Sequence, residues 1–145
     1  MSKKLSDSGV ELRGDKITKN ILTGFGIKIE TANDSDWDEE YLDLILSIKV
    51  VNGIKEAIDH INIHGSGHTE TIITKNPESA KQFQTQVDSS TIFWNASTRF
   101  TDGGEFGMGA EIGISTDKIG ARGPMGLEEL TTYKWLGVAD GLIRQ

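Results

Sequence analysis

The apolar and polar positions of the chain predict several short strands. Residues 9–13 alternate between apolar and polar side chains and are followed by Gly14, which predicts a short strand and a turn. Residues 44–51 are almost continuously apolar and become β-branched toward their end, as is typical of a strand buried on both faces. Residues 16–40, which lie between these two strands, contain an acidic cluster at 34–40 and are expected to be rich in loops.

The spacing of the apolar residues then changes to that of a helix. A helix is predicted over 54–64, because apolar residues recur there at i, i+3, i+4 and i+7, and it is expected to end at Gly65 and Gly67. Its buried face consists of Ile54, Ala57, Ile58 and Ile61. A second helix is predicted over 77–87, because Pro77 suits the first turn of a helix. Its expected buried side consists of Ala80, Phe83, Gln84 and Val87.

The order of these elements indicates an α/β fold. Residues 71–74 and 91–94 are β-branched or aromatic and predict two further strands. Strands that alternate with helices form βαβ units, so we expect one central sheet that contains both of them and the strand at 44–51. Residues 95–126 are rich in glycine, and long loops of this kind at the end of a strand are usually functional. Residues 129–136 are expected to form a last strand.

The composition narrows the choice of partners. The 145 residues suit one domain, and the net charge of −7 repels the phosphate backbone of nucleic acids. The apolar run at 44–51 is too short to span a bilayer, and no apolar stretch follows the first basic residues as it does in a signal peptide. We therefore expect a soluble cytoplasmic protein without a nucleic acid or membrane partner, whose ligand is a small molecule or another protein.

The residues that most often bind metals do not predict a metal site. The chain has no cysteine, which excludes disulfides and thiolate metal sites. His60, His64 and His68 follow one another at i, i+4 and i+8, a spacing that can bind a metal within a helix. Gly65 and Gly67 interrupt this helix before His68, so ordinary surface histidines are the favoured interpretation.

Residues 95–102 are the best candidate for a binding site. They combine neutral hydrogen-bonding side chains with the guanidinium of Arg99, a set of groups that can hold a planar anion. A turn with a surface arginine is the simpler alternative. The glycines of 103–113 do not have the spacing of a dinucleotide-binding loop. They are interpreted as positions that allow a loop to close over a ligand.

Three segments of this region resemble a known family. Residues 93–107 read Phe-Trp-Asn-Ala-Ser-Thr-Arg-Phe-Thr-Asp-Gly-Gly-Glu-Phe-Gly, 109–116 read Gly-Ala-Glu-Ile-Gly-Ile-Ser-Thr, and 121–127 read Ala-Arg-Gly-Pro-Met-Gly-Leu. In these segments the chain resembles the γ-glutamyl phosphate reductases of the aldehyde dehydrogenase superfamily. Residues 9–15 and 40–49 are also similar to that family, so the resemblance covers nearly the whole chain.

The resemblance implies an activity and a fold. Members of this family use NADPH to reduce L-glutamyl 5-phosphate to L-glutamate 5-semialdehyde in proline biosynthesis. A cysteine thiolate first attacks the acyl phosphate. The fold implied is a portion of an aldehyde-dehydrogenase-like catalytic domain, at 1–128, followed by an oligomerisation strand and tail at 129–145. That strand implies a homo-oligomer.

The resemblance carries over to individual residues unevenly. Glu40 falls at the glutamate of the superfamily's Glu-x-Phe-Gly-Pro motif, which contacts the nicotinamide ribose, although Leu42, Asp43 and Leu44 depart from that motif. The residues implied to bind the substrate are Asn95, Ser97, Thr98, Arg99, Phe106, Gly107 and Arg122. Gly120 stands where the family has a histidine.

The absence of cysteine limits what this chain is expected to do alone. By resemblance, the nucleophile and the cofactor-binding half precede residue 9, so we expect no catalytic residue in this chain, no tight cofactor binding and no activity by itself. The chain is then a fragment of the reductase. Alternatively, it is a non-catalytic interaction module or a split-enzyme subunit that pairs with the cysteine-bearing half. The missing thiolate argues against a self-sufficient enzyme.

Overall fold

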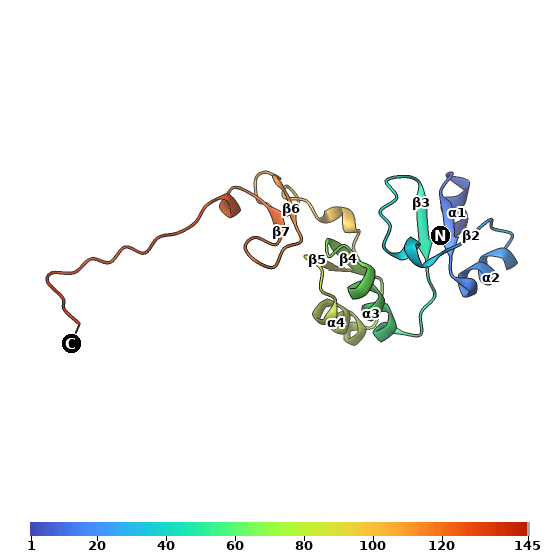
Figure 1. Ribbon diagram of the computed structural model, residues 1–145, viewed down its shortest axis with the longest axis horizontal. Coiled ribbons are helices and arrows are strands. Elements are labelled where there is room, and N and C mark those ends of the chain that lie inside the picture. Colours follow the sequence, from blue (N-terminus) through green and yellow to red (C-terminus); the bar gives the residue numbers. More distant parts are fainter. Residues whose placement is uncertain (145) are drawn as a thin grey trace.

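The computed structural model of the protein describes residues 1–144, and its elements follow one another along an elongated molecule (Figure 1). A unit at the N-terminus, in blue and cyan, is followed by a central unit in green, a small hairpin in orange and an extended C-terminal segment. The strands form three separate small sheets with the orders β2-β1-β3, β4-β5 and β6-β7. The expectation of one central sheet is therefore wrong, because β3 pairs with β1 and not with β4 or β5.

The N-terminal unit is built around a parallel sheet. Its elements are α1 (Ser2–Asp7), β1 (Glu11–Gly14), α2 (Lys16–Gly24), β2 (Glu30–Thr31), a 3₁₀ turn (Asp34–Trp37) and β3 (Ile45–Ile48). The central strand, β1, pairs in parallel with both neighbours, and Leu12 at its middle is 2% exposed.

Two expectations for this unit are wrong. Residues 16–40 contain the nine-residue helix α2, which begins because the carboxylate of Asp15 accepts a hydrogen bond from the backbone N–H of Thr18 at 2.9 Å. The second error concerns β3, which is not buried on both faces, since Leu46 remains 40% exposed and Leu44, just before the strand, 61% exposed. A run of apolar residues shows that a strand forms but not which of its faces is covered.

The central unit confirms the predicted alternation of helices and strands. It consists of α3 (Ile54–His64), β4 (Thr69–Ile72), α4 (Pro77–Gln86) and β5 (Thr91–Trp94), and β4 and β5 are parallel neighbours. Its core contains Ile58 of α3, Phe83 of α4 and Val87, which directly follows α4. Four partly buried side chains pack against these three residues. These are Ile54, Ile61, Ile72 and Ile92.

Small differences remain within this unit. Gln84 was expected on the buried side of α4 but is exposed, because the core takes up Ala80, Phe83 and Val87 only. β4 also begins and ends two residues before the predicted 71–74, and Ile73 beyond its end is 75% exposed.

The glycine-rich region is mostly irregular but contains a hairpin. The 3₁₀ turn Thr98–Phe100 follows β5, and β6 (Gly113–Ser115) and β7 (Gly123–Met125) pair in antiparallel fashion. Close backbone approach explains one of the glycines, since a side chain at Gly103 would collide with the carbonyl oxygen of Ala110.

The predicted strand at 129–136 is not present within this chain. The segment instead begins with the 3₁₀ turn Glu128–Leu130 and continues as an exposed extension, because no other strand of the described residues lies beside it (Figure 1). The last residue of the predicted segment 129–145 lies outside the described residues. Among residues 1–144, no helix has both the length and the apolar character needed to cross a membrane.

Candidate functional site

A cavity of about 1010 Å³ lies between the N-terminal and central units. One wall is the loop Trp37–Glu40, and the opposite wall comes from the C-terminal end of α3, the start of β4 and the 3₁₀ turn after β5. Its lining residues are Trp37, Asp38, Glu39, Glu40, Ile63, His64, Gly65, Ser66, His68, Thr69, Thr98, Arg99 and Thr116. Three predicted site residues, Glu40, Thr98 and Arg99, therefore share one cavity although they are distant in sequence.

The acidic loop, residues 34–40, is attached to α3 by side-chain contacts. Asp38 Oδ1 lies 2.7 Å from His64 Nδ1, and the ring of Trp37 meets that of His60 edge-on with centroids 5.6 Å apart. Lys49 Nζ lies 5.6 Å from the centroid of the Trp37 ring. Partial burial and the nearby Lys49 and His64 lower the pKa of His60, which favours the neutral imidazole beside the tryptophan. These contacts bring Glu40 to the cavity.

Arg99 supplies the cation on the opposite wall. Ser97 caps the short turn, and its Oγ accepts a hydrogen bond from the backbone N–H of Arg99 at 3.2 Å. Arg99 is exposed, and it takes part in none of the ion pairs found among residues 1–144. The guanidinium can therefore form the paired hydrogen bonds that a carboxylate or phosphate accepts.

Asn95 holds the ends of two strands together. Its backbone has a φ of 56°, and its side-chain amide both accepts from the backbone N–H of Thr74 and donates to the carbonyl oxygen of Thr74, each at 2.9 Å. Asn95 does not line the cavity. Its contacts fix the point at which the chain leaves β5 and enters the turn that carries Arg99.

Phe106 and Gly107 lie apart from this cavity. The Phe106 ring packs against that of Phe93 with centroids 6.4 Å apart, and it remains 45% exposed. Gly107, with a φ of 73°, lines a second cavity of about 420 Å³ together with Met108 and residues 126–129.

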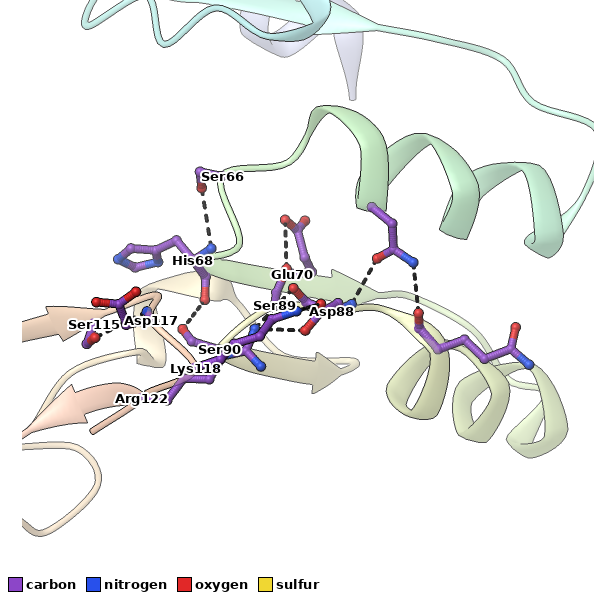
Figure 2. A network of polar contacts seen from close by, with 12 residues as sticks. Ser66, His68, Glu70, Asp88, Ser89, Ser90, Ser115, Asp117, Lys118 and Arg122 are labelled. Carbon is purple, nitrogen blue, oxygen red and sulfur yellow. Dashed lines mark hydrogen bonds and ion pairs between the residues drawn. The ribbon is translucent and has the colours of Figure 1, made fainter. Parts of the chain in front are cut away.

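The guanidinium of Arg122 forms an ion pair with a carboxylate of the same chain. Figure 2 shows Lys118 and Arg122, from the turn between β6 and β7, converging on Asp88 between α4 and β5. Arg122 Nη2 lies 2.9 Å from Asp88 Oδ1 and 3.2 Å from the Asp88 carbonyl oxygen. The two cations keep the pKa of Asp88 below its usual value. In this arrangement Arg122 attaches the hairpin to the central unit and does not line the main cavity.

Several cavity residues were not singled out from the sequence. Residues 37–39 belong to the acidic cluster and His64 and His68 to the histidine series, but neither pattern predicted a shared site. Among the described residues, no group of three or more His, Cys, Asp or Glu side chains is arranged to hold a metal ion.

The chain is similar to known proteins over its whole length. A sequence model described as the aldehyde dehydrogenase family matches residues 27–136. The γ-glutamyl phosphate reductase of Thermoanaerobacter sp. (strain X514) is 58% identical over 145 residues, all of this chain and 34% of that protein. That of Nautilia profundicola is 53% identical over 142 residues, 98% of this chain and 33% of that protein.

Solved structures agree with these sequence matches. The crystal structure of γ-glutamyl phosphate reductase from Thermotoga maritima superposes with a TM-score of 0.93 and 48% identity over 99% of this chain and 34% of that one. The Saccharomyces cerevisiae enzyme of that name superposes with a TM-score of 0.51 and 35% identity over 70% of this chain and 26% of that one. The chain thus spans about a third of the length of the curated relatives that it matches.

Proposed function

The chain belongs to the aldehyde dehydrogenase family, and we propose that it is the C-terminal part of a γ-glutamyl phosphate reductase that converts L-glutamyl 5-phosphate to L-glutamate 5-semialdehyde. The observation that carries this proposal is the 58% identity to such a reductase over all 145 residues. The matching backbone of the Thermotoga maritima reductase, at a TM-score of 0.93, supports it further.

In this proposal Arg99 binds the anionic substrate. The protein carries a net charge of −7, so a ligand with carboxylate and phosphate groups needs a local cation. Arg99 is exposed at the cavity and has no ion-pair partner among the described residues, while Thr98 offers a hydroxyl beside it. Ser97 and Asn95 act indirectly, since their hydrogen bonds hold the turn that carries Arg99.

The cavity also fits one part of a nicotinamide cofactor. Glu40 presents an exposed carboxylate at the cavity wall, and a carboxylate accepts hydrogen bonds from ribose hydroxyls. NADPH supplies the hydride for the reduction when it is bound to the complete enzyme. Within this chain, Glu40 orients the ribose, and the remaining cofactor contacts come from elsewhere.

The nucleophile must also come from outside these 145 residues, because they contain no cysteine. A thiolate there attacks the carbonyl carbon of the acyl phosphate and phosphate leaves, so that the acyl group is transferred to sulfur before it is reduced. We expect no tight cofactor binding and no turnover from this chain alone. The complete enzyme is proposed to be a cytoplasmic homo-oligomer in which residues 1–128 form part of the catalytic domain.

A fusion protein tests the proposal. This chain would replace the matching third of the Thermoanaerobacter reductase, and NADPH oxidation would be followed with glutamyl phosphate as substrate. We expect turnover, and we expect Arg99→Ala to raise the KM for glutamyl phosphate roughly 10- to 100-fold, because a charged hydrogen bond is lost. Arg122→Ala is the comparison variant, since Arg122 pairs with Asp88 outside the cavity. An inactive fusion protein, or an unchanged KM in Arg99→Ala, would contradict the proposed roles.

The exposed C-terminal segment favours a second candidate function. Tyr133, Trp135 and Leu136 are 79%, 89% and 80% exposed, which is unusual for three large apolar side chains so close in sequence. The chain would then be a subunit that pairs with a separate cysteine-bearing half. Mixing it with the separately produced remaining two-thirds of the Thermoanaerobacter reductase distinguishes the possibilities. Restored turnover favours a split enzyme, and co-purification without turnover favours an interaction module.

A further inference from the structure

Asp36 is a buried residue of the N-terminal unit whose carboxylate accepts hydrogen bonds from two side chains and one backbone N–H. The residue is 6% exposed, and its Oδ1 accepts hydrogen bonds from Arg13 Nη1 and from the Tyr41 hydroxyl, both at 2.6 Å. Its Oδ2 accepts from the backbone N–H of Asn33 at 2.6 Å. The Tyr41 hydroxyl also lies 2.7 Å from Ser47 Oγ, which donates to the Asp36 carbonyl oxygen at 3.1 Å. All oxygens of Asp36 are thereby engaged.

The charges of this network stabilise one another. Hydrogen bonds from Tyr41, the Asn33 backbone and Arg13 lower the pKa of Asp36 to about 2, so the carboxylate stays ionised despite its burial. The guanidinium of Arg13 lies 4.9 Å from the centroid of the Tyr41 ring, and its Nε donates to Glu11 at 2.6 Å. Arg13 is therefore held from two sides, on a strand that is itself the centre of the sheet.

Two residues of this network flank one wall of the cavity in sequence, but they do not line the cavity themselves. The four consecutive residues Trp37–Glu40 line the cavity, and the residues immediately before and after them are Asp36 and Tyr41. Neither Asp36 nor Tyr41 is among the lining residues. Both ends of this wall segment are thus attached to the sheet, through Arg13 of β1 and Ser47 of β3. The contact between Asp38 and His64 attaches its middle to α3.

We propose that Arg13, Asp36 and Tyr41 are positioning residues that fix the wall segment and thereby place Glu40 for its contact with the cofactor ribose. This inference rests on the proposed function, in which Glu40 accepts hydrogen bonds from that ribose. A loop of four residues attached at both ends loses its conformational freedom before the cofactor binds, which strengthens binding without an additional contact. Loss of the buried charge at Asp36 releases one attachment and leaves the more exposed Glu11 as the ion-pair partner of Arg13.

The kinetic test uses the fusion protein described above. Asp36→Asn should raise the KM for NADPH about tenfold, while the KM for glutamyl phosphate and kcat change by less than about twofold. Tyr41→Phe should have a smaller effect in the same direction. Asp34→Asn is the matched control, because Asp34 lies in the same 3₁₀ turn and its side chain makes no hydrogen bond among the described residues. It should leave every kinetic constant unchanged.

A double-mutant cycle shows whether the network acts through Glu40. Glu40→Gln alone should raise the KM for NADPH, and adding Asp36→Asn to it should cause little further change, because the contact that Asp36 positions is already lost. Fully additive effects would overturn the proposal. A uniform loss of kcat and both KM values, with a lower melting temperature, would also overturn it, since that pattern indicates a structural role only.

A fluorescence measurement on the 145-residue chain tests the positioning independently of activity. With Trp94→Phe and Trp135→Phe, Trp37 becomes the only tryptophan and reports on the wall segment. Asp36→Asn should increase its quenching by acrylamide at least twofold, and Asp34→Asn should not. If the fusion protein is inactive, the proposed function fails, and the quenching result alone decides whether the network fixes the loop. Unchanged quenching in Asp36→Asn would refute the positioning role in either case.

Discussion

Replacing Phe83 with alanine should destabilise the scaffold that carries one wall of the candidate site. Phe83 is 3% exposed and forms the core of the central unit with Ile58 and Val87. The same unit carries the end of α3 and the turn with Arg99, which line the cavity. A buried phenylalanine replaced by alanine loses its transfer free energy and leaves a cavity behind, which together cost about 3–5 kcal/mol.

This cost should be visible in an ordinary unfolding experiment. With a urea m-value of about 2 kcal/mol/M, a loss of 3–5 kcal/mol lowers the midpoint of unfolding by roughly 1.5–2.5 M. Far-UV circular dichroism in urea, at low micromolar protein, measures the midpoint. Phe83→Leu keeps an apolar side chain of similar size and should cost only about 1–1.5 kcal/mol.

An exposed phenylalanine provides the control. Phe25 is 78% exposed just after α2, so Phe25→Ala should change the free energy of unfolding by no more than about 0.5 kcal/mol. If Phe83→Ala and Phe25→Ala had the same effect, the cluster of Ile58, Phe83 and Val87 would not be the core of the central unit.

Three further outcomes are expected of the 145-residue chain. It should show no NADPH-dependent turnover of glutamyl phosphate, because it contains no cysteine, and activity well above buffer would contradict this. It should self-associate at tens of micromolar in sedimentation velocity, and a protein ending at residue 130 should do so less. Since the pKa of Asp36 is lowered from 3.8 to about 2, its stabilisation is complete above about pH 4 and is lost as the pH falls toward 2. Acid unfolding of Asp36→Asn should lack that component.

Elements with local signals could be predicted from the sequence. The helix α3 has apolar residues at helical spacing and ends at Gly65, as expected. Asn76 accepts hydrogen bonds from the backbone N–H groups of Glu78 and Ser79, and Pro77 occupies the first turn of α4, so the start of that helix is determined by four adjacent residues. In contrast, α2 was not predicted, although Ile17, Ile21 and Leu22 lie at helical spacing and Asp15 caps its first turn, because the helix is short and lies between glycines and an acidic cluster.

Contacts between distant residues could not be predicted in the same way. The acidic loop was recognised as an acidic cluster, but its contact with α3 joins Asp38 to His64 across 26 residues. The family motif at 121–127 implies a substrate contact for Arg122, whereas its partner in the structure, Asp88, lies 34 residues away. The spacing of apolar residues predicts neither of these two side-chain contacts, because both depend on how the small sheets are placed relative to one another.

Two groups of exposed apolar side chains have different expected partners. Phe25, Leu42 and Leu44 are 78%, 88% and 61% exposed on the N-terminal unit, whereas Trp135 and Val138 are 89% and 96% exposed on the C-terminal extension. A soluble monomer rarely exposes so many large apolar side chains close together. Under the proposed function, in which the chain is about a third of a reductase, we propose that the first group contacts the remaining part of that enzyme. The extension lies far from that unit (Figure 1). An extended backbone with unpaired hydrogen-bonding groups instead suits the sheet edge of a neighbouring subunit, so both groups follow from the same proposed function.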